Sequence, residues 1–129
     1  IMANNSSLCG HVDIHDYAIL GGFTVVHQFI RVGAHVITGL GSMVFKDIPP
    51  YVTAAGNDAK PYGINSEGLK RRGFSADEIA AIKRAYKTIY RKSLSFEDAK
   101  NELAAMHGVC GKIQLLSDFL NQSTRGIIR

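Results

Sequence analysis

A strict period of six runs through residues 1–48 and limits what this chain can fold into. From Met2, every sixth residue is aliphatic, Met or Thr: Met2, Leu8, Ile14, Leu20, Val26, Val32, Thr38 and Val44. Four places later in each hexad stands a small or aliphatic residue: Ser6, Val12, Ala18, Thr24, Ile30, Val36, Ser42 and Ile48. An α-helix, with a period of 3.6, has no reason for a strict period of six. A triangular coil explains it, because each side takes six residues, points an aliphatic side chain inward and then turns. Stacked coils pair as parallel strands about 4.8 Å apart, so the pattern predicts a parallel β-helix.

The position after the first column is rich in glycine, with Gly21, Gly33 and Gly39 as examples. We interpret these glycines as corner residues, because glycine tolerates the backbone angles of tight corners. One turn of three sides takes eighteen residues, so the eight hexads make about two and two-thirds coils. A stable repeat array needs roughly three units and a capped end. Ile1 begins in register with no cap before it. We therefore expect further coils to precede this segment in the intact protein.

The period breaks at Asp47-Ile48-Pro49-Pro50, because proline cannot donate to a strand ladder. We expect residues 1–50 to be β-helix coils and residues 51–74, rich in turn formers, to be a loop or linker. Residues 75–129 are predicted to form a small α-helical domain.

Three helices are expected in that domain. Ser75-Ala76-Asp77-Glu78 is a capping box that opens the first helix. Its apolar face has helical spacing and comprises Ile79, Ile82, Tyr86, Ile89 and Tyr90. A second helix is expected from Ser95 to His107-Gly108, and a third near Lys112 to Asn121.

Charge is divided unevenly along the chain. Residues 1–64 carry three Lys or Arg against four Asp or Glu, whereas residues 65–129 carry twelve against seven, and the whole chain has net charge +4. A basic face attracts nucleic acid, phosphorylated ligands or an acidic protein, and it is also consistent with a plain solvated helix face. The longest apolar stretch, Tyr17 to Val26, is about half of what a membrane span needs.

Four of the five histidines lie between residues 11 and 35, but their spacing does not favour a metal site. With eighteen residues per coil, His11, His15, His27 and His35 fall in four different columns, so none stacks directly on another. His11 and His27 are near enough in register to line one site. Cys9 and Cys110 have no CxxC spacing, so neither zinc nor a disulfide framework is signalled, which fits a reducing cytoplasm.

Several motifs closely resemble the bacterial acyl-(acyl-carrier-protein)–UDP-N-acetylglucosamine O-acyltransferases. They are Asn4-Asn5, Gly10-His11-Val12, Gly21-Gly22-Phe23-Thr24, His27-Gln28-Phe29, Pro49-Pro50-Tyr51, the run GLKRRGF at 68–74 and Ser123-Thr124-Arg125-Gly126. The resemblance implies a left-handed parallel β-helix, a homotrimer and a cytoplasmic enzyme of lipid A biosynthesis. That enzyme moves a 3-hydroxyacyl chain from acyl carrier protein to the 3-hydroxyl of UDP-N-acetylglucosamine.

No cofactor of the enzyme's own is implied, because acyl carrier protein brings the phosphopantetheine, and neither nucleic acid nor a membrane span is implied. The acidic carrier protein would face the basic helices. By the same resemblance, His11 supports catalysis, the Gly10 backbone N–H holds the thioester oxyanion, and His27 and Gln28 contact the UDP-sugar.

Asn65, Glu67, Arg71 and Arg72 match substrate-binding residues that a neighbouring subunit contributes, and arginine suits phosphate because its planar fork is always charged. Two departures from the family pattern matter. The family's catalytic base is a histidine about one coil before His11, a position that precedes Ile1, so this chain alone is expected to have little or no activity. Leu40 stands where members that accept long chains have glycine, so we expect a shorter acyl donor.

The sequence leaves two other hypotheses open. One is a different hexapeptide acyltransferase, such as the N-acyltransferase acting later in the same pathway or a sugar-nucleotide acetyltransferase. The other is a trimerising scaffold that keeps the fold without the chemistry. A histidine about nineteen residues upstream of His11 would separate the enzyme from the scaffold.

Overall fold

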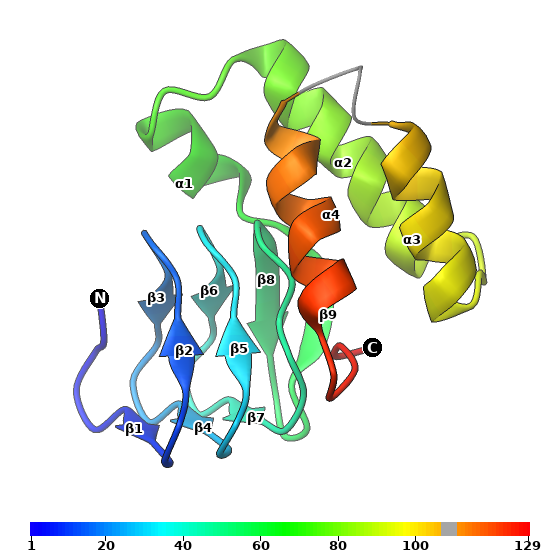
Figure 1. The fold of residues 1–129 in the computed structure, drawn as a ribbon. Helices are drawn as coiled ribbons and strands as arrows, with labels where there is room; N and C mark the ends of the chain where they lie inside the picture. Colours follow the sequence, from blue (N-terminus) through cyan, green and yellow to red (C-terminus); the bar gives the residue numbers. More distant parts are fainter. Residues whose placement is uncertain (107–110) are drawn as a thin grey trace.

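The first half of the chain forms stacked coils of a parallel β-helix in the computed structural model, which describes residues 1–106 and 111–129 (Figure 1). Each coil contributes one two-residue strand to each side of a triangle. These strands are β1 (Ser7–Leu8), β2 (Asp13–Ile14), β3 (Ile19–Leu20), β4 (Val25–Val26), β5 (Arg31–Val32), β6 (Ile37–Thr38) and β7 (Met43–Val44). The three sides are β1-β4-β7, β2-β5 and β3-β6-β8-β9. Paired residues such as Ser7 with Val25 are eighteen apart, so the predicted period is confirmed.

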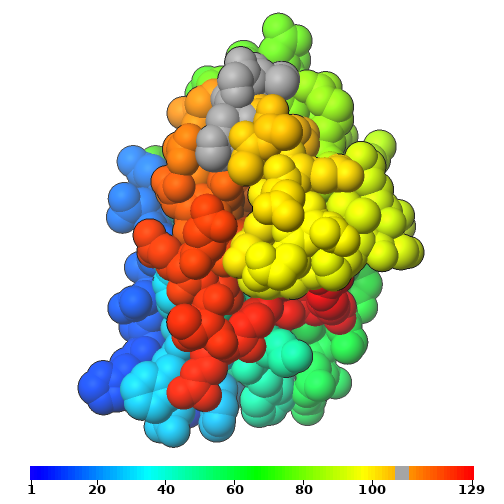
Figure 2. Space-filling view, turned by 45° about the vertical axis from the view of Figure 1, so that its right-hand side comes forward, coloured from blue at the N-terminus to red at the C-terminus, as the bar shows by residue number. Residues whose placement is uncertain are grey.

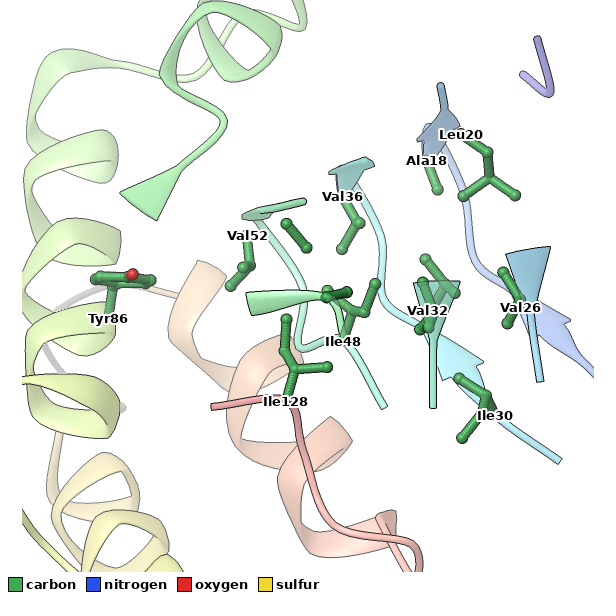
Figure 3. Packing of buried hydrophobic residues seen from close by; sticks show 13 residues of the cluster. Ala18, Leu20, Val26, Ile30, Val32, Val36, Ile48, Val52, Tyr86 and Ile128 are labelled. Carbon is green, nitrogen blue, oxygen red and sulfur yellow. The ribbon is translucent and has the colours of Figure 1, made fainter. Parts of the chain in front are cut away.

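Both predicted inward columns lie inside the coils. Leu20, Val26 and Val32 are fully buried, and Figure 3 shows them pointing into one core with the neighbouring aliphatic side chains. Met2 and Leu8 are 47% and 38% exposed, because they pair with Leu20 and Val26 of the next coil on one side only. Burial therefore grows along the β-helix axis toward the helical part of the molecule.

The glycines of the repeat have a different role from the predicted one. The left-handed corner residues, with φ near +60°, are Asn5, His11, Tyr17, Phe23, Phe29 and His35, none of them glycine, followed by Gly41. Gly33 instead stands where the next coil approaches: a Cβ there would lie 2.4 Å from the Pro50 nitrogen. Gly21, Gly33 and Gly39 follow strands β3, β5 and β6 at the corners, but none of them has a positive φ, so the turn angle does not explain glycine there. A glycine in this column allows close contact between coils rather than the turn itself.

The expected loop at residues 51–74 contains regular structure: β8 (Val52–Ala55), β9 (Lys60–Ile64) and helix α1 (Ser66–Arg71). Strand β8 continues the β3-β6 side in parallel, and Ile37 pairs with Thr53 at an offset of sixteen residues. The last coil is thus two residues shorter than the others. Proline does not end the ladder, because the Tyr51 N–H just beyond Pro50 donates to the Ala34 carbonyl. The division of the chain at residues 50 and 74 stays a prediction.

Three longer helices cover the end of the β-helix: α2 (Ala76–Tyr90), α3 (Phe96–Ala105) and α4 (Lys112–Gln122). The capping box of Ser75 and Glu78 is confirmed, and Ser95 caps α3. Tyr86 of α2 joins the β-helix core, and its hydroxyl accepts a hydrogen bond from the Gly63 N–H. The expected end of the second helix at His107-Gly108 lies outside the described residues, as does Cys110. No helix within the described ranges has the length and apolarity needed to cross a membrane.

A buried carboxylate fastens the segment after α4 to the coils. Asp47, 1% exposed, accepts hydrogen bonds from the Arg31 N–H at 2.9 Å and the Ser123 hydroxyl at 2.7 Å. The Asp47 carbonyl also accepts from the Ile128 N–H. Figure 2 shows α4 and this final segment running down over the coils, with α3 beside them. The C-terminal segment therefore belongs to the packing of the last coil.

Replacing Gly33 with alanine tests the close approach of the coils. The added methyl group meets backbone atoms of Pro50, which cannot move aside as a flexible side chain can. We expect Gly33→Ala to lower the free energy of unfolding by about 1–3 kcal/mol in urea denaturation. Gly10→Ala is the matched control, because a Cβ on Gly10 meets nothing within 4 Å. Equal stability of the two variants would contradict this role of Gly33.

Candidate functional site

The triangular cross-section separates the predicted site residues into three groups, one at each corner of the β-helix. We call residues 9–12 and 27–30 the first corner, residues 15–18 and 33–36 the second, and residues 21–24 and 39–42 the third. The first corner carries Gly10, His11, His27 and Gln28, and the third carries Leu40. Asn65, Glu67, Arg71 and Arg72 come from α1 and its flanks, beside the second corner. One chain therefore does not bring all the predicted residues together.

Histidine and phenylalanine rings stack at the first corner. The His11 ring lies parallel to Phe29 one coil later, with 5.1 Å between ring centroids, and His27 packs at 5.6 Å on Phe45. Arg125 from the final segment covers Phe29, with its Cζ 5.1 Å from the ring centroid. His11 and His27 are both exposed at this corner, in columns two residues apart. That these two histidines line one site stays a prediction.

A cavity of about 680 Å³ lies between the second corner and α1. Its lining comprises Ile1, Tyr17, Ile19, His35, Ile37, Asn65, Glu67, Gly68, Arg71 and Arg72. We call this the second-corner cleft. It contains all four residues that, by the resemblance, match substrate-binding residues contributed by a neighbouring subunit. Tyr17 and His35, which sequence reasoning did not select, form its opposite wall.

Asn65 attaches α1 to the β-helix. Its side chain accepts a hydrogen bond from the Gly68 N–H at 3.2 Å and donates one to the His35 carbonyl at 3.1 Å. Its backbone N–H donates to the Tyr51 carbonyl at 2.7 Å. A Cβ on Gly68 would lie 2.4 Å from the Asn65 side-chain amide, so glycine there leaves room for the capping side chain. Asn65 thus caps the helix and fixes where the arginines at its end emerge.

An aromatic column stands behind Arg72. The Arg72 Cζ lies 4.1 Å from the centroid of the Tyr17 ring, and Tyr17 stacks on His35 at 5.0 Å. His35 in turn stacks on Tyr51 at 5.8 Å, and Phe74 meets His35 edge-on at 5.1 Å. Tyr17 and His35 are eighteen residues apart, which is the coil period. Applying that period to aromatic residues as well as histidines would have revealed this first pair of the column from the sequence, but not Tyr51, which follows His35 by sixteen residues.

Charge in the cleft is predominantly positive. Burial, Arg72 and Lys112 together lower the pKa of His35, with Asp16 opposing them. Glu67 pairs with exposed Lys70 at 3.6 Å. Within the described residues neither Arg71 nor Arg72 forms an ion pair, so both guanidinium groups are available to an anion. The same part of the chain holds no group of three His, Cys, Asp or Glu that could bind a metal ion.

Leu40 lies alone among the predicted residues at the third corner. Its side chain is 78% exposed, and its Cδ1 would lie 3.1 Å from a Cβ built on Gly22 of the preceding coil. The leucine therefore lies over a glycine and presents an apolar surface at this edge. Hydroxyls lie behind it, with Thr24 and Thr38 hydrogen-bonded at 2.9 Å inside the coil.

Comparison with known proteins gives one consistent family. The family model described as UDP-N-acetylglucosamine O-acyltransferase, domain 2, matches residues 47–128. The acyl-(acyl-carrier-protein)–UDP-N-acetylglucosamine O-acyltransferase of Thiobacillus denitrificans is 57% identical over 129 residues, which is 100% of this chain and 50% of that protein.

Solved structures agree with this similarity. The UDP-N-acetylglucosamine O-acyltransferase of Moraxella catarrhalis matches with a TM-score of 0.96 and 41% identity, covering 99% of this chain and 50% of that one. Its counterpart from Acinetobacter baumannii has a TM-score of 0.96 and 40% identity, with the same coverage. The predicted fold class, a left-handed parallel β-helix followed by a small helical part, is thereby confirmed. The chain spans about half the length of the curated relatives it matches.

The lowered pKa of His35 predicts a specific dependence of stability on pH. As pH falls below 6.5, the unfolded chain takes up a proton that the folded protein resists, so the free energy of unfolding decreases until His35 is protonated in the folded state too. His35→Asn should flatten this decrease, because asparagine tolerates the left-handed backbone at this corner. Urea denaturation between pH 5 and 7.5 measures it.

A second variant checks that prediction. Burial and Arg31 also lower the pKa of His15, so adding His15→Asn should flatten the pH dependence further. An unchanged slope in His35→Asn would contradict the prediction.

Proposed function

The chain belongs to the UDP-N-acetylglucosamine O-acyltransferase family, and from this we propose that the intact protein acylates UDP-N-acetylglucosamine. It would transfer a 3-hydroxyacyl chain from acyl carrier protein to the sugar 3-hydroxyl, the first step of lipid A biosynthesis. The observation that carries the proposal is the second-corner cleft, in which Asn65, Glu67, Arg71 and Arg72 meet.

The cleft suits the nucleotide end of the substrate. A diphosphate needs cationic donors, and Arg71 and Arg72 are exposed without carboxylate partners among the described residues. Guanidinium forks form paired hydrogen bonds to phosphate oxygens and stay charged at every working pH. We therefore propose that these two arginines bind the diphosphate, while Asn65 and Glu67 contact the remainder of the nucleotide.

The reacting end of the substrate is proposed to lie at the first corner. There the sugar hydroxyl attacks the thioester carbonyl, a base removes the hydroxyl proton, and the carrier thiol leaves. The Gly10 backbone N–H would hold the oxyanion, since a fixed donor of this kind is worth about 3–4 kcal/mol. His11 would support the base, and His27 and Gln28 would contact the sugar. By family resemblance the base is a histidine one coil before His11.

A homotrimer would join these two regions. In one chain the first and second corners are different edges of the triangle, so the nucleotide-binding and reacting groups are apart. A neighbouring copy that presents its second corner to the first corner of this chain would bring them together. We propose that assembly as the complete site, with one site at each of three interfaces.

Acyl carrier protein is proposed to approach over the basic surface of α2. Lys83, Arg84 and Lys87 are exposed there, and Arg84 and Lys87 line a hollow of about 480 Å³ with Lys92. An acidic carrier would be steered to this surface, and the attraction would weaken with added salt. The carrier supplies the phosphopantetheine arm, so we propose no other cofactor and a cytoplasmic location where both substrates are made.

Transfer of a 3-hydroxyacyl chain from acyl carrier protein to UDP-N-acetylglucosamine tests the function directly. The intact protein should form the 3-O-acyl product. Residues 1–129 alone should be slower by about 10²–10⁴-fold, because they lack the proposed base. His11→Ala in the intact protein should also reduce kcat. Comparable turnover by residues 1–129 and the intact protein would disprove the proposed role of an upstream base.

Leu40 is proposed to limit the length of the acyl chain. Its side chain would occupy space that the last methylenes of a long donor need. Leu40→Gly in the intact protein should move the preferred donor to longer chains, with about a fourfold gain in kcat/KM for each methylene newly buried. Leu40→Ala should give an intermediate preference. Competition between acyl donors of different lengths measures the change, and an unaltered preference would remove Leu40 from this role.

A further inference from the structure

We propose that Tyr17 is a positioning residue whose ring holds the Arg72 guanidinium ready for an anion in the second-corner cleft. The inference rests on the proposed function in one respect, namely that the anion is the diphosphate of a uridine nucleotide. The platform itself is a property of this chain, because both residues and every ring behind them lie within it.

The position of Arg72 leaves its side chain with few restraints. Its backbone is fixed, since its N–H donates to the Gly68 and Leu69 carbonyls at the end of α1. Its side chain is exposed and forms no ion pair among the described residues. The contact that restrains the guanidinium is the Tyr17 ring, 4.1 Å from Cζ to centroid. Without a platform, so long a side chain would sample many rotamers before binding an anion.

Tyr17 is itself held from behind. It also stacks on His35, which is buried and packs against Tyr51 and Phe74. Tyr17 and His35 occupy the same left-handed corner position of successive coils, with φ of 63° and 61°. The column is therefore buried at the Tyr51 end, while Tyr17 remains 54% exposed. A ring fixed in this way offers one face to a cation without needing a hydroxyl contact.

Arg71 lies in the same cleft as Arg72 but differs from it in its aromatic contacts. Arg71 lines the cleft but has no aromatic ring within cation–π distance in the described structure. Arg72 is thus preorganised, whereas Arg71 has to be ordered by the ligand. Preorganisation lowers the entropic cost of binding, so the two arginines should contribute differently although their charges are equal.

Three single variants of the intact protein separate ring, hydroxyl and backbone effects. Tyr17→Asn removes the ring but suits the left-handed corner, where this chain already uses Asn5 with φ of 61°. Tyr17→Phe keeps the ring and removes the hydroxyl. Phe23→Asn is the matched control, since Phe23 is 59% exposed and left-handed at the third corner, away from Arg72.

Binding and turnover of UDP-N-acetylglucosamine provide the first readout. Tyr17→Asn should raise Kd and KM about two- to fivefold while kcat stays close to that of the unmodified protein. Tyr17→Phe and Phe23→Asn should leave all three constants unchanged. In an Arg72→Ala background, Tyr17→Asn should have no further effect. Unchanged affinity in Tyr17→Asn, loss of affinity in Tyr17→Phe, or additive losses with Arg72→Ala would each overturn the proposal.

A ligand-free readout keeps the inference distinct from the proposed function. Nitrogen-15 relaxation of the arginine Nε groups should report Arg72 as more ordered than Arg71 in the unmodified protein and in Tyr17→Phe. In Tyr17→Asn the two arginines should be equally mobile. That result would support the platform even if UDP-N-acetylglucosamine did not bind, in which case the proposed function would fail alone. An Arg72 Nε as mobile in the unmodified protein as in Tyr17→Asn would refute the platform.

Discussion

The stacking of one coil on the next is the interaction on which the rest of this molecule depends. Each strand from β1 to β7 is two residues long and could not persist alone, so order comes from hydrogen bonds between coils and from the aliphatic column inside them. Stacking also requires that residues eighteen apart lie over one another. That requirement builds the core on the inside and, on the outside, places ring upon ring at the corners. Tyr17 over His35 and His11 over Phe29 are two results of the same constraint.

The last coil turns this regular array into a support for other elements. It is two residues short, which allows Tyr51 to reach the second corner and β8 to pair with β6. The chain then returns through β9 and enters α1 at Asn65, whose amide is bonded to the His35 carbonyl. A change of two residues in coil length thereby determines where Arg71 and Arg72 emerge. On another edge, the Asp47 carboxylate brings the segment after α4 back to the coils and Arg125 over Phe29.

These connections explain why site residues far apart in sequence have correlated positions. Arg72 is restrained by Tyr17, fifty-five residues earlier, because α1 is capped against the same corner that carries the aromatic column. The burial that lowers the pKa of His35 comes from the same packing. Structural and proposed binding roles therefore overlap at the second corner, and Asn65 is the clearest case, since its side chain holds α1 while lining the cleft.

The sequence alone determined the coil period, both inward columns and the capping box of α2, because each of these depends on spacing within one stretch of chain. It also carried the family resemblance, through motifs spread from Asn4 to Gly126. The stacking of Tyr17 on His35 also followed from that spacing, whereas Tyr51 and Phe74 join the column through the shortened last coil and the tertiary packing. Only the tertiary structure explained why glycines recur in the repeat. It alone also revealed the shortened last coil and the strands β8 and β9. They depend on how closely one coil approaches another, as at Gly33 and Pro50, and on pairing between segments that share no local pattern. The same holds for the second-corner cleft. The sequence identified Arg71 and Arg72 as candidate binding residues, but only the packing of α1 against the second corner placed Arg72 beside Tyr17.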